Sequence, residues 1–484
     1  MLVPPIRPIY QIEEARSFGR CSAGVSRFYC PASLDEVCQV FDIAKLERRR
    51  VVVRGGGHSF DGQAVHNGDA AEHIVLSTET LPKPPIRIDT AKKLVTLSAG
   101  YSWGEYFQYA SSQPGPLFLP GSMQTGRLTT VGGSLSGDCL SRFSGVGGKE
   151  SQWVESFRLL TTQGQLLDVS RQSNSDLFRA VIGGHGYLGL VTEATYRLVA
   201  VPNPGFARTD VTIHDNFTGL IQHQLQLVGN HKGDTRAISS AWFNRIFSKP
   251  GAIKGGVFDS YYSAEDAGLP GFPLYSSIDS PGRVAIELFV RAHPFNQVVH
   301  EYLLGDVEIE GKFQNELLGF LFFMDGNTHA KLFYEKKFHE WFQIVQQTFV
   351  VPTANAVDFA TILDAKMRKY HLRPTECDML YVAADDCWMS GNYNMNGFAI
   401  SMAFEPIRGS CPSPKIVSFL QELSIDCMNL GGRLHWVKNA QAFPDTFRRM
   451  FNDQGQMDRF EQLKRQYDPH GLLQNEFSDR FFHF

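Results

Sequence analysis

The chain has 484 residues, of which 43% are apolar and 20% charged, and its formal net charge is −4. This length exceeds what one hydrophobic core usually organises and predicts two domains, while the composition excludes a disordered or fibrous protein. The near-neutral charge gives no general attraction to nucleic acid or to an anionic membrane, so we expect a small-molecule partner.

Residues 1–8 lack the basic and apolar regions of a secretory signal, and no run of about 18 apolar residues follows. We therefore expect a cytoplasmic protein without a membrane span; the sequence is compatible with a homo-oligomer but does not determine one. The 8 cysteines form no C-x-x-C pair and show no Cys/His spacing typical of zinc. We expect reduced thiols and no metal site.

Residues from about 20 to 200 alternate short apolar strands with helical stretches, as in an α/β domain. A capped helix is predicted to begin near Ser33, because its apolar positions continue at helical spacing. Residues 86–98 alternate as a hairpin, and a further helix is expected from about residue 102.

The strand after the first helix runs directly into a glycine loop and a histidine, VVVRGGGHSF at residues 51–60. Three successive glycines let the backbone take positive φ and present bare N–H groups to an anion. We interpret the loop as a cradle for the pyrophosphate of FAD and the histidine as the attachment point of the flavin. The residues assigned to the cofactor here are Arg54, Gly55, Gly56, Gly57, His58 and Ser59.

A second glycine cluster spans residues 119–138 and contains LPGS and TTVGGSLSGD. Small residues at this density let a flat aromatic ring lie on the backbone, and hydroxyl groups can bond its heteroatoms. The alternative is a long surface loop, which apolar Leu128, Val131 and Leu135 disfavour. The residues assigned to FAD here are Pro120, Gly121, Ser122, Thr130, Gly132, Gly133, Ser136 and Gly137.

A third cluster, IGGHGYLG at residues 182–189, contains a formal G-x-G-x-x-G. A dinucleotide-binding fingerprint needs a strand before it and a helix after it. Here the order is reversed, because residues 174–181 read as a capped helix and residues 190–196 as a strand. We predict a helix-to-strand turn that packs on something flat, without an NAD site. The residues assigned to FAD are Gly184, Gly186, Gly189 and Val191.

In this order and spacing, the three motifs resemble the FAD-binding domain of the vanillyl-alcohol-oxidase superfamily of FAD-linked oxidases. The resemblance covers about residues 20–200 and implies a two-domain α+β flavoprotein. It also implies that His58 matches the histidine bonded to the flavin 8α-methyl group in many members. The berberine-bridge-like branch adds a cysteine bond, but Arg127 or Leu128 stands at that place and Cys139 lies beyond it. We expect one covalent bond.

The C-terminal end carries GGRLHWVK at residues 431–438 and YDPHGLL at 467–473. These segments are similar to the ends of aldonolactone and alditol oxidases, which carry H-W-x-K, and to the decaprenylphosphoryl-ribose oxidase branch, where an arginine replaces the flavin-linked histidine. Because His58 is retained, the resemblance favours sugar and polyol oxidases. From the same tail, Asn475 is added to the residues assigned to FAD.

The H-W-x-K segment supplies the candidate catalytic residues. On an extended strand, Trp436 and Lys438 share one face. Trp436 would then line the space between flavin and substrate, and the Lys438 side chain would extend into that space. His435 on the other face is the alternative. A lysine near flavin N1 stabilises the negative charge that arises on reduction. Without the resemblance, an exposed strand lysine is the simpler interpretation.

The character of the chain changes after residue 204. We predict an FAD-binding domain over 1–204, a substrate domain of antiparallel sheet with flanking helices over 205–430, and a segment over 431–484 that returns to the first domain. Asp138 and Arg142 are candidates for substrate contact or for a structural salt bridge. Tyr381 and Asn392 are candidates for substrate contact or for a solvent-facing loop.

We therefore expect hydride transfer from a CH–OH group of a sugar, polyol or glycosylated natural product to flavin N5. Reoxidation by O2 would release hydrogen peroxide, and the small residue at Gly137 would leave a path for O2. The alternative is a dehydrogenase or epimerase component that passes electrons to another acceptor. A non-catalytic flavin fold would need decayed loops, and these are intact. The general base is not identified by the sequence.

Overall fold

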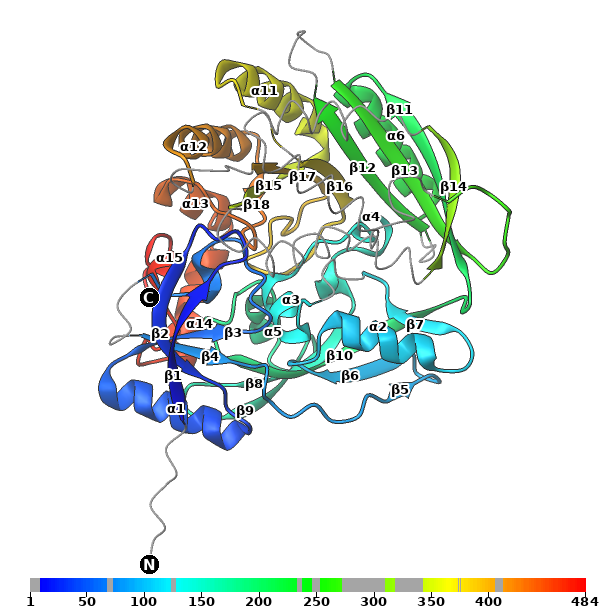
Figure 1. Cartoon of the computed structure of the whole chain (residues 1–484). Coiled ribbons are helices and arrows are strands. Elements are labelled where there is room, and N and C mark those ends of the chain that lie inside the picture. The colour runs from blue at the N-terminus through cyan, green and yellow to red at the C-terminus, as the bar shows by residue number, and fades with distance from the viewer. Residues whose placement is uncertain are drawn as a thin grey trace, which may run out of the picture.

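In the computed structural model, the described residues are 9–67, 73–122, 128–232, 237–245, 253–271, 310–317, 343–372, 374, 376–404 and 412–484. Arg127, considered above as the counterpart of a second flavin-linked residue, lies outside them. Figure 1 shows two lobes, with β1 to β10 in the lower one, β11 to β17 in the upper one, and the C-terminal helices beside both.

The first sheet has the strand order β1-β2-β4-β3. β1 and β2 form an antiparallel hairpin, and β4 lies parallel to both β2 and β3. The predicted helix is confirmed as α1, because the Ser33 side chain caps it by accepting a bond from the Glu36 amide. The bounds are β1 (Tyr10–Arg16), β2 (Ala23–Tyr29), α1 (Leu34–Glu47), β3 (Arg50–Arg54), η1 (Gly62–Ala64) and β4 (His73–Ser77).

The second sheet has the order β5-β6-β10-β8-β9, with β7 also paired to β10. The predicted hairpin, the helix after it and the helix-to-strand turn are confirmed as β5–β6, α2 and α5–β10. The second glycine cluster, expected to offer flat backbone, contains the short helix α3. The bounds are β5 (Ile88–Asp89), β6 (Leu94–Ser98), α2 (Trp103–Ser112), β7 (Leu117–Pro120), α3 (Val131–Gly137), α4 (Ser144–Gly147), η2 (Glu150–Gln152), β8 (Val154–Leu160), β9 (Leu166–Ser170), α5 (Ser175–Val181) and β10 (Leu190–Val201).

The third sheet is antiparallel, with the order β14-β11-β13-β12-β16-β17-β15-β18. Its helices lie on the side away from the first two sheets (Figure 1), so its other face is turned toward them. The bounds are β11 (Phe206–His214), α6 (Phe217–Asn230), β12 (Ala237–Arg245), β13 (Ile253–Ser263), β14 (Gly311–Glu316), β15 (Val345–Pro352), η4 (Thr353–Asn355), α11 (Ala356–Lys369), β16 (Glu376–Val382), β17 (Gly397–Phe404), α12 (Pro414–Asn429) and β18 (Arg433–Leu434). The predicted α+β fold class is confirmed.

The C-terminal tail packs against the first sheet. The Val51 amide donates to the Leu472 carbonyl at 2.7 Å, and the Asn475 side chain donates to the Gly62 and Val65 carbonyls at 2.7 and 2.9 Å. The last residues of the chain therefore support the glycine loop that follows β3. The bounds are α13 (Pro444–Phe451), α14 (Gln456–Tyr467) and α15 (Glu476–Asp479).

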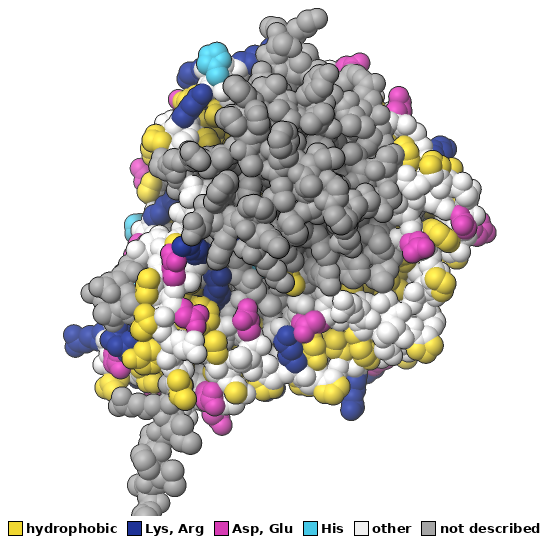
Figure 2. All heavy atoms as spheres, viewed as in Figure 1, with side chains coloured by type: hydrophobic (Ala, Val, Ile, Leu, Met, Phe, Trp, Pro, Cys, Tyr) yellow, Lys and Arg dark blue, Asp and Glu magenta, His cyan; other side chains and the backbone are white. Residues whose placement is uncertain are grey.

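Two observations concern the wider molecule. Cys21 is disulfide-bonded, so the expectation of reduced thiols throughout is wrong there, although six other cysteines are free: Cys30, Cys38, Cys139, Cys377, Cys387 and Cys427. Among the described helices, none combines the length and the apolar character that crossing a bilayer requires. Figure 2 shows acidic and basic side chains interspersed over the described part of one face.

Candidate active site

A cavity lies where the three sheets meet. The space inside it is about 1710 Å³ when the open solvent at its mouth is included. The predicted residues that line it are Gly55, Gly56, Gly57, His58, Ser59, Thr130, Gly132, Gly133, Ser136, Arg142, Gly186, Gly189, Val191, His435 and Lys438. The three glycine clusters and the H-W-x-K segment thus meet at one place.

The glycine loop after β3 lies directly on the segment before α3. A Cβ atom at Gly55 would collide with the Thr130 hydroxyl, and one at Gly56 with the Leu128 carbonyl. Gly57 has φ of +70°, and the Arg54 guanidinium lies directly behind it. Arg54 donates to two main-chain carbonyls, of Ala64 and Arg16, so it supports the loop from outside the cavity.

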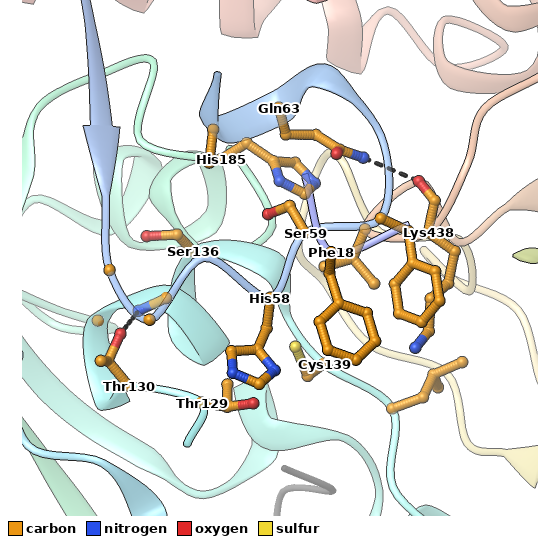
Figure 3. Close-up of a pocket in the computed structure, with 18 of the residues that line it drawn as sticks. Phe18, His58, Ser59, Gln63, Thr129, Thr130, Ser136, Cys139, His185 and Lys438 are labelled. Carbon is orange, nitrogen blue, oxygen red and sulfur yellow. Dashed lines mark hydrogen bonds between the residues drawn. The ribbon is translucent and has the colours of Figure 1, made fainter. Parts of the chain in front are cut away.

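His58 projects from this loop into the cavity. Its ring stacks on Phe18, with the centroids 5.0 Å apart and the planes at 23°. The Phe18 amide donates to the Ser59 carbonyl at 2.7 Å, so the two segments are also joined through the backbone. Figure 3 shows the His58 and Phe18 rings side by side, with Lys438 beyond Phe18. No sequence motif indicated Phe18.

The α3 helix forms despite its glycines, because the Thr130 hydroxyl caps it by accepting a bond from the Gly133 amide at 3.2 Å. The Gly132 amide donates to the Ala99 carbonyl at 2.9 Å, which holds the helix against β6. Gly137 lies outside the lining of the cavity: a Cβ there would meet the Val437 side chain at 2.6 Å. Its smallness permits close packing on Val437.

The turn between α5 and β10 adds a histidine that the sequence interpretation overlooked. His185 adopts φ of +50° and lines the cavity. Its Nε2 atom is buried without a hydrogen-bond partner in the part of the chain that the structure describes. Burial lowers the pKa of His185 to about 3, so the ring is neutral. Gly184, in contrast, faces the Ala180 carbonyl and Phe460 and lies outside the lining.

The H-W-x-K segment is a turn, and the expectation of an extended strand is wrong. β18 ends at Leu434, and the Lys438 amide donates back to the His435 carbonyl at 3.4 Å. His435, Val437 and Lys438 consequently line the cavity, while Trp436 points away. The Trp436 indole donates to the Met389 carbonyl at 2.9 Å and packs among the phenylalanines Phe447, Phe451, Phe477 and Phe482.

Gln63 of η1 fastens this turn to the first domain. Its side-chain amide donates to the carbonyls of Trp436 at 2.7 Å and Lys438 at 2.8 Å. The Lys438 ammonium lies 4.0 Å from the centroid of the Phe60 ring, a distance at which a cation is attracted to the ring face. The lysine is thereby positioned by Gln63, which belongs to no motif, and by Phe60, the last residue of the glycine-loop motif.

The site holds neutral imidazoles beside this cation. Burial, together with the positive charges of Lys149 and Lys438, lowers the pKa of His435 well below its ordinary value. His435 and His185 are therefore both uncharged at neutral pH, with a nitrogen lone pair on each ring. Either ring can accept a hydrogen bond from a group in the cavity, but the lowered pKa of each disfavours the uptake of a proton.

The third sheet, called the upper sheet below because of its place in Figure 1, contributes a row of polar side chains to the cavity. Thr348, Ser401 and Asp378 are directly opposite one another on β15, β17 and β16, and all three line the cavity. The Thr348 hydroxyl donates to the Ser401 hydroxyl at 3.0 Å. Because side chains alternate along a strand, Tyr381 on β16 faces the other way, where it packs edge-to-face on Phe398.

Two substrate candidates, Asp138 and Asn392, lie outside the lining of the cavity and bond within the protein. Asp138 is ion-paired with Lys149 and accepts a bond from the Ser151 amide at 3.1 Å, and the Lys149 ammonium also lies 3.1 Å from Asp385. Asn392 donates to the Ala383 carbonyl at 2.5 Å. For Asp138, this ion pair favours the alternative of a structural salt bridge. Also outside the lining are the predicted FAD residues Pro120, Gly121, Ser122 and Asn475.

The residues present fit a large flat cofactor such as FAD. At Gly55, Gly133 and Gly186 the wall of the cavity has no side chain, so backbone can approach an aromatic ring or a phosphate closely. His185 offers a buried nitrogen that still lacks a partner within the described residues.

Comparisons with known proteins agree with this fit. A family model described as an FAD binding domain matches residues 25–170, and one described as D-arabinono-1,4-lactone oxidase matches residues 330–481. The chain is 25% identical to decaprenylphosphoryl-beta-D-ribose oxidase of Mycolicibacterium smegmatis over 89% of both chains. It is 23% identical to L-gulonolactone oxidase of Bos taurus over 97% of both. Cytokinin dehydrogenase 1 of Arabidopsis thaliana is 29% identical over 40% of this chain and 34% of its own length.

Proposed function

Because the chain is an FAD-linked oxidoreductase of the vanillyl-alcohol-oxidase superfamily, we propose that it oxidises the CH–OH group of a sugar, polyol or glycosylated natural product. FAD, when bound, supplies the acceptor for the hydride that leaves the carbon. The observation that carries the proposal is that His58 and Lys438, from opposite ends of the chain, face one cavity together with a polar row of the upper sheet.

The glycine loop and the start of α3 form the cofactor side of the cavity. The bare backbone of Gly55, Gly56 and Gly133 would cradle the cofactor, and the His58 imidazole would carry it through a single covalent bond. Phe18 supports this bond because its ring holds the imidazole from one face.

The upper sheet and the 435–438 turn form the substrate side. The Asp378 carboxylate and the hydroxyl groups of Thr348 and Ser401 would bind substrate hydroxyls, since together they offer both donors and acceptors. The Lys438 ammonium supplies positive charge where negative charge develops during hydride transfer. Neutral His435, which lines the same wall, would accept a hydrogen bond from the substrate hydroxyl, whereas its lowered pKa disfavours it as the base that takes the proton.

The first experiment measures hydrogen peroxide under air while sugars, polyols and simple alcohols are screened. Peroxide in step with substrate loss is expected for an oxidase. Turnover that appears only with an artificial electron acceptor would refute the oxidase proposal and favour the alternative, a dehydrogenase or epimerase component.

Covalent attachment is tested separately by denaturing the purified protein. Flavin that stays with the polypeptide in the wild type and in His470→Ala, an exposed control, but is released from His58→Ala, is the expected result. Release from the wild type would refute the bond without touching the redox activity.

The substrate side is tested with Asp378→Asn. We expect KM for a polyol to rise by about tenfold or more, because a bond to a charged group is worth roughly 1.5–3 kcal/mol. The control is Tyr381→Phe, a change on the opposite face of the same strand. Equal effects of the two variants would contradict the assignment.

Location is proposed as cytoplasmic. The disulfide at Cys21 bears on it, since disulfides persist mainly in oxidising compartments. Cell fractionation decides between the cytoplasm and an oxidising compartment. Light scattering determines whether the chain is a homo-oligomer.

A further inference from the structure

The upper sheet presents apolar side chains to the cavity beside the polar row of Thr348, Ser401 and Asp378. Leu380 on β16 and Ala399 on β17 are directly opposite each other, and both line the cavity. Each stands two residues along its strand from a member of the polar row. Side chains two residues apart point to the same face of a sheet, roughly 7 Å from each other. One face of the sheet therefore offers the cavity a polar row and, next to it, an apolar one.

A leucine from the lower lobe of the molecule meets this apolar pair. Leu140 follows α3, lines the cavity, and packs on the hydrophobic cluster that contains Leu380 and Ala399. Both of these residues are buried, whereas Leu140 is only partly buried. We call Leu140, Leu380 and Ala399 the apolar strip. The two lobes thus bring carbon surface to the same part of the cavity wall.

The apolar strip contributes little to the binding of the hydroxyl groups of a free sugar. Hydroxyl groups need hydrogen-bond donors and acceptors, and a hydroxyl group placed against carbon loses its bonds to water without replacing them. Carbon surface favours binding where the ligand covers it with carbon of its own. A ligand that uses both rows must therefore carry hydroxyl groups on one part and an apolar group on the part roughly 7 Å away.

We propose that the substrate is a glycoside whose aglycone is an alkyl or aryl group, and that the apolar strip binds this aglycone. The polar row would bind the hydroxyl groups of the sugar part. The inference rests on the proposed oxidation of a CH–OH group, and it selects the glycosylated product among the three substrate classes named there. Leu140 and Leu380 would then determine specificity rather than chemistry, because they touch the aglycone and not the reacting carbon.

The test measures the binding of glucose and of its methyl, butyl and hexyl β-glucosides to the oxidised holoprotein by isothermal titration calorimetry. The titrations are done under argon, so that reduced flavin is not reoxidised and turnover does not continue. We expect the affinity to rise by about two- to fourfold for each added methylene until the apolar strip is covered, since each methylene removes further carbon surface from water. Glucose itself should bind most weakly.

Variants separate the apolar strip from the polar row. Leu140→Ser and Leu380→Ser should make the affinity nearly independent of chain length, because each removes carbon surface from the strip. The matched control is Leu225→Ser, which changes an exposed leucine of α6 and should keep the dependence seen in the wild type. Asp378→Asn should lower the affinity for every glucoside by a similar factor and keep the dependence on chain length. If the buried position makes Leu380→Ser unable to fold, Leu140→Ser at the partly buried member still provides the test.

Three results overturn the inference: no binding of any glucoside, an affinity in the wild type that does not depend on chain length, or the same dependence in Leu140→Ser as in the wild type. The last result would mean that the alkyl chain binds elsewhere. None of the three affects the peroxide measurement, which tests the proposed function by itself with other substrates. Conversely, the absence of redox activity with every substrate refutes the proposed function, whatever the titrations show.

Discussion

Gln63 provides the sharpest test of how the two ends of the chain build the active site. In Gln63→Glu the side chain keeps its shape and its bond from the Asp61 amide, but it can no longer donate to the Trp436 and Lys438 carbonyls. Each buried acceptor left without a donor costs about 1–3 kcal/mol. One of the two lies only partly buried, so we expect a loss of about 2–4 kcal/mol of unfolding free energy.

The consequence for catalysis follows from the position of Lys438. If its backbone is released, the ammonium leaves its place over Phe60, and a displacement of about 1 Å can reduce kcat/KM by about a hundredfold. The assay combines urea unfolding with steady-state turnover. The control Gln163→Glu removes a single exposed bond to the Gln466 carbonyl, which should change stability by no more than about 0.5 kcal/mol.

The reasoning is refuted if both glutamate variants unfold at the same urea concentration and turn over alike. A loss of stability without a loss of turnover would support the first part of the reasoning and refute the second. Gln63 would then hold the 435–438 turn, but the position of Lys438 would not depend on it. A third variant, Gln63→Met, shows how much of the stability loss in Gln63→Glu comes from the new negative charge. Methionine removes the two donors but places no carboxylate against the Trp436 and Lys438 carbonyls.

Three further predictions concern the packing around the cavity. In Gly56→Ala the new Cβ meets the Leu128 backbone carbonyl, so we expect flavin content to fall severalfold, whereas Gly229→Ala, with open space around it, should be neutral or stabilising by up to about 1 kcal/mol. Burial raises the pKa of Glu150 from 4.5 to about 8. Between these pH values the folded state holds a proton that the unfolded chain releases, so the stability should fall as the pH rises from 4.5 through 8. Glu150→Gln should flatten that part of a curve of Tm against pH. Lys149→Met leaves two buried aspartates without their cation and should cost about 3–5 kcal/mol in urea unfolding.

What the sequence allowed us to predict was the part of the site encoded in contiguous motifs. The glycines around His58 and around Thr130 were assigned to one cofactor because bare backbone has few other uses at that density, and they do line one cavity. The reversed order of helix and strand around Gly186 correctly excluded a dinucleotide fingerprint. Such inferences need only local geometry.

What could not be predicted depends on long-range pairing. Phe18 and Gln63 reach the site through contacts with residues far along the chain, and neither belongs to a motif. The polar row depends on strand register, which places Asp378 opposite Ser401, and register is set by the whole sheet. The error at Trp436 has the same origin, since phenylalanines from the C-terminal helices bury the indole and end the strand early.

These contacts explain why the last residues of the chain belong to the mechanism as much as the glycine loop does. Burial of Trp436 pulls the 435–438 backbone into a turn, and that turn, rather than a strand, brings His435 and Lys438 to the cavity together. Alternation along a strand would have separated them onto opposite faces. The aromatic cluster, which touches neither cofactor nor substrate in our proposal, therefore determines that a neutral imidazole and a cation lie at the same wall.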